Sequence, residues 1–198
     1  MSSHHIVRDE QEPALLILNL EAIHRSTLSS LLEWSPTIII TGDLVNQAID
    51  IGFKVDVVVC GRDELENTRT ALNNHIPLVC LTANKIELLE VVSMHLLSSN
   101  HTALSILVDS FDTFQRSLKS SSKLDLVVYD AENKWYKVHG EFKKWFNEGQ
   151  ELKVIGSDYR LSGVGSKYSE ENEIFTVKEE GLLTITASNA VWFGERII

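Results

Sequence analysis

The sequence predicts a mixed α/β fold, in which a layered α/β domain with a mostly parallel sheet precedes a small antiparallel β-domain. Short apolar runs rich in leucine, isoleucine and valine recur through the first half of the chain. Segments with helical periodicity lie between them, and the second half changes to short β-branched or aromatic runs separated by turn residues. A chain of 198 residues can hold one large domain, or one medium domain and one small domain.

The apolar runs of the first half are typical of strands that are covered on both faces. They are continuous rather than alternating, as in the strands of a buried parallel sheet. In chain order they are Leu15–Leu18, Thr37–Thr41, Val55–Cys60, Ile76–Leu81 and Leu104–Val108. We therefore expect a strand at each of these positions, with the thiols of Cys60 and Cys80 free and buried.

Amphipathic helices are expected between these strands. One apolar stripe comprises Ile23, Leu28, Leu31 and Leu32, and another comprises Ile86, Leu88, Leu89, Val92, Leu96 and Leu97. The alternation of strand and helix predicts right-handed crossover connections between parallel strands. Sheets of this kind bind ligands at the carboxyl ends of their strands, which here lie near Asn19, Gly42, Gly61, Thr82 and Asp109.

The second half of the chain is predicted to be a separate β-domain. The polar run KSSSK at 119–123 separates the two patterns, so we predict domains at 1–122 and 123–198. The run Leu124–Tyr129 is expected to be the first strand of the second domain. Further short strands are expected at KWYKV, LKVIG, EIFTVKE, GLLTITA and AVWFGERI, and an amphipathic piece at FKKWFNEG.

Composition and charge exclude several kinds of partner. The formal net charge of −10 opposes binding to the phosphate backbone of nucleic acids, so no nucleic-acid partner is expected. No apolar run approaches the roughly 20 residues of a membrane span, so no membrane partner is expected either. The first residues, MSSHHIVRDEQEP, are too polar for a secretory signal, and we expect a cytoplasmic protein.

The stretch Thr41–Leu65, TGDLVNQAIDIGFKVDVVVCGRDEL, has the layout of a strand, a helix, a second strand and an acidic loop. It resembles the thiamin pyrophosphokinase family, in which an aspartate follows the first strand and a Gly-Asp-x-Asp-Ser loop follows the second. In this register Gly42 stands at the position of the first aspartate, with Asp43 one step away. Cys60-Gly61-Arg62-Asp63-Glu64 falls on the loop, where Asp63 keeps one aspartate and Gly61 replaces the other.

Two further motifs of the family also depart from its pattern. Asn84-Lys85-Ile86-Glu87 occupies the place of an Asp-x-Thr-Asp motif that opens a long helix. FDTFQR, Phe111–Arg116, stands where the family carries Gly-Gly-Arg-x-Asp-His. The resemblance therefore covers the layout of the chain and identifies a divergent member with degraded active-site motifs.

The resemblance implies a C-terminal thiamin-binding β-sandwich, a homodimer, and pyrophosphoryl transfer from ATP to thiamine with Mg²⁺. Mg²⁺ prefers carboxylate oxygens and water, and it neutralises the phosphate charges during transfer. Asp63 and Glu87 are the candidate catalytic and metal-binding residues. Asp43, Arg62, Asn84 and Asp109 are candidates for the nucleotide or substrate pocket, with Arg62 able to contact a phosphate.

Other interpretations of these residues remain open at this point. Asp63, Glu87 and Asp43 are also explained as caps or first-turn residues of helices, where a carboxylate stabilises the helix dipole. Asp109 is equally a turn residue. The alternative function is therefore a catalytically silent homologue, a pseudoenzyme, that acts as a ligand-binding or dimeric assembly module. A different enzyme acting on nucleotides or sugar phosphates is the third alternative.

Overall fold

The computed structural model describes residues 13–21, 23–118, 123–163, 168–171 and 174–197. The chain divides into two compact units, Met1–Ala131 and Glu132–Ile198. None of the helices in the described ranges is long and apolar enough to cross a membrane.

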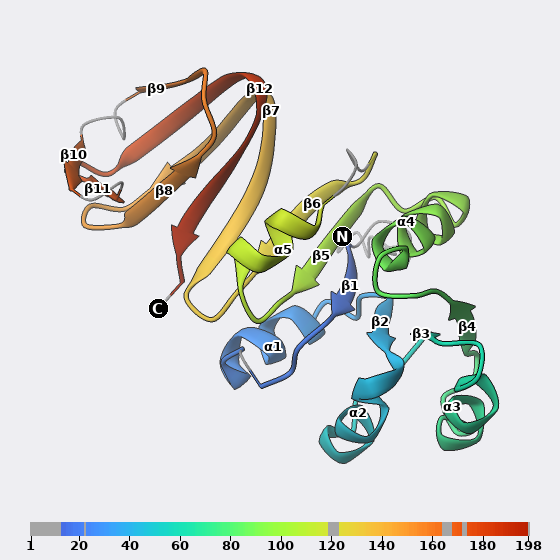
Figure 1. Ribbon diagram of the computed structural model, residues 1–198. Coiled ribbons are helices and arrows are strands. Elements are labelled where there is room, and N and C mark those ends of the chain that lie inside the picture. The colour runs from blue at the N-terminus through green and yellow to red at the C-terminus, as the bar shows by residue number, and fades with distance from the viewer. Residues whose placement is uncertain (1–12, 22, 119–122, 164–167, 172–173, 198) are drawn as a thin grey trace, which may run out of the picture. The chain divides into compact units, whose positions relative to one another are not determined.

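The first unit alternates strands and helices, as predicted. Its elements are β1 (Ala14–Ile17), α1 (Arg25–Leu32), β2 (Ile38–Thr41), the short 3-10 helix η2 (Gly42–Leu44), α2 (Val45–Ile51), β3 (Val57–Cys60), α3 (Leu65–Ala71), β4 (Val79–Thr82), α4 (Leu88–Ser98), β5 (Ala103–Leu107), α5 (Phe111–Ser117) and β6 (Asp125–Tyr129). The strands pair in the order β6-β5-β1-β2-β3-β4, and all these pairings are parallel (Figure 1). The predicted parallel sheet is confirmed.

Burial explains why these apolar runs form strands. Every residue of β1 and of β3 is buried, because helices cover both faces of the sheet. Successive strand residues face opposite sides: Leu15 and Leu31 of α1 line one pocket, whereas Leu16 lines another together with Leu89 of α4 and Phe114 of α5. The edge strand β4 is more exposed, and there the expectation of cover on both faces is wrong.

The division between the units falls later than the predicted boundary between residues 122 and 123. The run Leu124–Tyr129 provides β6, which pairs in parallel with β5 from Ala103↔Asp125 to Leu107↔Tyr129. It therefore extends the parallel sheet of the first unit. The continuous apolar sequence DLVVY is typical of such a strand, since Leu126 and Val128 are buried.

The second unit consists of antiparallel strands. They are β7 (Asn133–Phe146), β8 (Glu151–Ile155), β9 (Tyr159–Gly163), β10 (Tyr168–Glu171), β11 (Ile174–Val177) and β12 (Gly181–Arg196). The long strands β7 and β12 pair along their whole length, and β12 also pairs with β9 through its first half and with β8 through its second half. The apolar core lies among these strands and includes Phe146, Phe175, Ile185, Val191 and Phe193.

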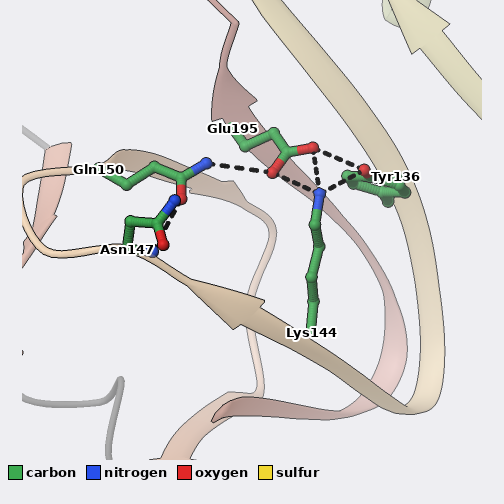
Figure 2. Close-up of polar contacts among 5 residues, drawn as sticks. All are labelled: Tyr136, Lys144, Asn147, Gln150 and Glu195. Atoms are coloured by element: carbon green, nitrogen blue, oxygen red, sulfur yellow. Dashed lines mark hydrogen bonds and ion pairs between the residues drawn. The ribbon is translucent and has the colours of Figure 1, made fainter. Parts of the chain in front are cut away.

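A polar network in this unit joins Tyr136, Lys144 and Gln150 to Glu195 (Figure 2). The carboxylate of Glu195, only 4% exposed, accepts hydrogen bonds from the Tyr136 hydroxyl at 2.6 Å and from Lys144 Nζ at 2.5 and 2.6 Å. Gln150 Nε2 donates to the same carboxylate at 3.4 Å. Because a buried charge is tolerated only when it is paired and hydrogen-bonded, this network stabilises the pairing of β7 with β12 and holds Gln150, which precedes β8.

We predict that Lys144→Met lowers the free energy of unfolding by about 3 kcal/mol, because it removes the cation that hydrogen-bonds to the buried Glu195 carboxylate. The neighbouring Lys143 forms an exposed pair with Glu141 at 2.7 Å, so Lys143→Met is the matched control and should cost less than about 1 kcal/mol. Denaturant unfolding followed by tryptophan fluorescence measures both. Equal losses in the two variants would show that the buried pair has no special role.

Candidate functional site

The candidate site lies at the carboxyl ends of the parallel strands of the first unit. Asp43 follows β2, Asp63 follows β3, Glu87 follows β4 and Asp109 follows β5, and all four carboxylates are exposed. Ligands bind at this edge of open α/β sheets. The elements therefore place each predicted residue at the expected edge, and the distances among them decide which of them can act together.

The corner between β2 and β3 is closely packed. Thr41 pairs with Val59, so Gly42 comes directly beside Cys60. A Cβ atom at Gly42 would lie 2.8 Å from Cβ of Cys60, closer than such atoms approach in proteins. A Cβ atom at Gly61 would lie 2.8 Å from Asp63 Oδ1. At these two positions, where the resembling family carries aspartates, this chain provides no side chain.

Glu64 is a site residue that the sequence reasoning missed. Its Oε2 accepts a hydrogen bond from the Gly61 backbone N–H at 3.1 Å, while the Glu64 N–H donates to the Gly61 carbonyl at 3.1 Å. This reciprocal pattern resembles a capping box, and the three-residue spacing from Gly61 to Glu64 before a helix was its signal. The Asp63 side chain makes no capping bond to α3, whose N-cap residue is Glu64.

Asn84 has a structural role at the entry to α4. Its Oδ1 accepts hydrogen bonds from the backbone N–H groups of Ile86 at 2.9 Å and Glu87 at 3.0 Å. These amides have no partner within the helix, so the side chain satisfies them in place of a cap. The oxygen that the sequence assigns to a substrate pocket is thus occupied within its own loop.

The other predicted residues lie apart from the β2–β3 corner. Strands in a sheet are about 4.8 Å apart, and β1 and β2 separate β5 from β3, so Asp109 and Asp63 are anchored roughly 14 Å apart. Glu87 instead lines an apolar groove of about 600 Å³ between α4 and α5, with Leu18 and Phe114 among the other residues of its wall. Arg62 is exposed on the same loop as Asp63.

The residues present do not fit a Mg²⁺ ion. Within the described ranges, no group of three or more histidine, cysteine, aspartate or glutamate side chains is arranged to hold a metal. Glu64 and Asn84 each use an oxygen on a backbone amide, and Gly42 and Gly61 supply none. Several oxygens must converge to bind Mg²⁺, and at the β2–β3 corner only those of Asp63 and Glu64 lie near one point.

Cys60 does not substitute for the missing ligands. Burial raises the pKa of its thiol, and nearby Cys80, Glu64 and Asp63 raise it further against a hydrogen bond with Thr68. A thiol that stays protonated is a poor metal ligand and a poor nucleophile. As predicted, Cys60 is free and buried.

Solved structures with the same fold are found, although neither a protein-family model nor a curated protein sequence matches this chain. Thiamine pyrophosphokinase from Bacillus subtilis has a TM-score of 0.65 and 14% identity over 93% of this chain and 98% of its own. The Candida albicans enzyme has a TM-score of 0.64 and 11% identity over 94% and 90%. The yeast enzyme has a TM-score of 0.62 and 13% identity over 98% and 88%. The chain therefore has the fold of the thiamin pyrophosphokinases, as the layout of its sequence predicts.

Proposed function

We propose that this protein is a catalytically silent relative of the thiamin pyrophosphokinases that binds a small molecule, thiamine or a nucleotide, at the carboxyl edge of its parallel sheet. One observation carries the proposal: side-chain oxygens at the β2–β3 corner and at the entry to α4 accept hydrogen bonds from backbone amides. These oxygens belong to Glu64 and Asn84. Pyrophosphoryl transfer from ATP depends on Mg²⁺ to neutralise phosphate charge, and these residues do not gather around one.

Ligand binding without transfer needs fewer groups than catalysis does. Arg62 and the exposed carboxylates of Asp43, Asp63 and Asp109 surround the strand ends, where this class of sheet receives its ligands. An arginine contacts a phosphate through two parallel hydrogen bonds and needs no metal to do so. We assign Arg62 to a phosphate or another anionic group, and the carboxylates to the positively charged or hydrogen-bonding parts of the ligand.

The rest of the proposal follows the family that the fold resembles. The α/β unit takes the position of the catalytic-type domain, and the antiparallel unit takes the position of the thiamin-binding β-sandwich. We further propose that the protein is cytoplasmic and forms a homodimer. Sedimentation velocity tests the dimer: a single species with the mass of the 198-residue monomer would refute it.

The second candidate function is a weakly active thiamin pyrophosphokinase. It is favoured by the position of two acidic oxygens, since Asp63 Oδ1 and Glu64 Oε2 lie 2.8 and 3.4 Å from the same point, the Cβ position of Gly61. If Glu64 releases the Gly61 amide, this pair could hold one Mg²⁺ weakly, with Glu87 as a more distant carboxylate. The two candidates differ in turnover.

We predict no formation of thiamine diphosphate from thiamine, ATP and Mg²⁺ above the rate of a control without protein. The Bacillus subtilis enzyme, assayed in parallel, provides the positive control. Turnover by this chain that Asp63→Asn abolishes would establish the weakly active enzyme instead, because Asp63 is the acidic residue that both readings place on the loop after β3.

We predict that thiamine or ATP raises the melting temperature by binding the folded state, and that Mg²⁺ leaves this increase unchanged. Calorimetric titration with each ligand, with and without Mg²⁺, measures the affinity. Arg62→Ala should weaken the binding of ATP at least tenfold and leave the binding of thiamine unchanged. If neither ligand gives heat or a shift in melting temperature, the binding function is refuted.

We predict that Asn84→Ala lowers the free energy of unfolding by about 1 kcal/mol, because the Ile86 amide loses its acceptor and the Glu87 amide keeps only the Asn84 carbonyl. Asn84→Asp keeps the acceptor and should be as stable as the natural protein. Denaturant unfolding compares the three proteins. Equal stability of all three would remove the structural role assigned to Asn84.

A further inference from the structure

At the candidate site, Gly42 has no side chain and lies close to the side chain of Cys60. Gly42 follows the end of β2, and Cys60 is the last residue of β3. A Cβ atom at Gly42 would meet Cβ of Cys60 at 2.8 Å, whereas Cα of Cys60 lies 3.6 Å away, an ordinary van der Waals distance. The obstacle is therefore the Cys60 side chain and not the strand to which it is attached.

Neither residue can move aside at low cost. Cys60 is 4% exposed, and β3 is held between β2 and β4 by parallel pairing on both sides. The backbone of Gly42 does not explain the glycine either, because its φ lies outside the positive range that favours glycine. The contact with Cys60 is the physical reason that this position has no side chain.

We propose that Gly42 and Cys60 form a coupled pair, in which the Cys60 side chain fills the space of an acidic residue after β2 and so closes this corner to divalent cations. The proposal rests on the proposed function, a relative without catalytic activity. It also gives a physical cause for the lack of activity. The resembling family carries an aspartate at the position of Gly42 and a glycine at the position of Cys60. In this chain the side chain that occupies the corner therefore comes from β3 and not from the loop after β2.

Glycine at position 60 would reopen the corner. The nearest remaining atoms to a Cβ at position 42 would then be Glu64 Oε2 at 3.5 Å and Cα of residue 60 at 3.6 Å. A carboxylate introduced there would lie next to Glu64, whose Oε2 is also 3.4 Å from the Cβ position of Gly61, where Asp63 Oδ1 lies at 2.8 Å. Three carboxylates gathered at one corner make the hard oxygen site that a divalent cation requires.

A thermal unfolding cycle tests the coupling of the pair. Gly42→Ala should lower the melting temperature by about 4–8 °C in the natural background, because it overpacks a buried corner. The same change in the Cys60→Gly background should lower it by less than about 1 °C. Should Gly42→Ala be equally destabilising in both backgrounds, or harmless in both, the coupling does not exist and the proposal falls.

A cation titration tests whether the Cys60 side chain closes this corner to divalent cations. Mn²⁺ is the probe, since its binding is read directly from the loss of the free-ion spectrum in electron paramagnetic resonance. Gly42→Asp with Cys60→Gly should bind Mn²⁺ at least tenfold more tightly than the natural protein and than the matched control, Gly42→Asn with Cys60→Gly. Equal affinity in the aspartate and asparagine variants would overturn the assignment of this corner as a closed cation site.

The outcomes separate this inference from the proposed function. If the natural protein forms thiamine diphosphate, the silent function fails, while the unfolding cycle still reports whether Gly42 and Cys60 are coupled. If the natural protein is silent but the cycle shows no coupling, the function stands and its cause lies elsewhere in the loops. Neither result depends on activity of the redesigned variants.

Discussion

The burial of short parallel strands on both faces is the constraint on which the first unit depends. Each of β1, β2 and β3 has only four residues, and all of them except Thr41 at the end of β2 are apolar and buried. Polar residues are thereby confined to the loops, and the loops after β2, β3, β4 and β5 meet at one edge of the sheet. The same packing brings neighbouring loops so close that one side chain excludes another, as Cys60 excludes any at Gly42.

The loops at this edge use their polar groups to complete the backbone. Helix and turn entries leave amides without acceptors, and each capping bond contributes about 1 kcal/mol. Glu64 and Asn84 provide such bonds, so a ligand that needs their oxygens must first release the amides. Competition of this kind weakens metal binding even where carboxylates are near, because the ion has to offset the lost caps as well as its own dehydration.

Sequence patterns predicted the first unit well because its strands and helices follow single periodicities. The α5 helix was missed, although Ser110 accepts from the Thr113 amide and Phe111 and Phe114 are buried, because its seven residues span too few turns to show a stripe. In the second unit, several short strands were predicted where β7 and β12 are each one long strand. The positive φ of Gly140 and the irregularity between Ala187 and Val191 lie opposite each other, and they interrupt the alternation without ending the pairing.

Position along the chain located the site at the correct edge, but contact geometry could not be read from the sequence. The spacing of Asp43, Asp63, Glu87 and Asp109 reports only that each follows a strand. Whether their oxygens converge depends on how each loop folds. In the loop after β3, the side chain that folds back onto the Gly61 amide is that of Glu64 and not that of Asp63. The interactions that hold the fold, from the buried strands to the Glu195 network, involve none of these residues. For this reason the fold is shared with the Bacillus subtilis enzyme at 14% identity, although Gly42 and Gly61 provide no side chain at the β2–β3 corner.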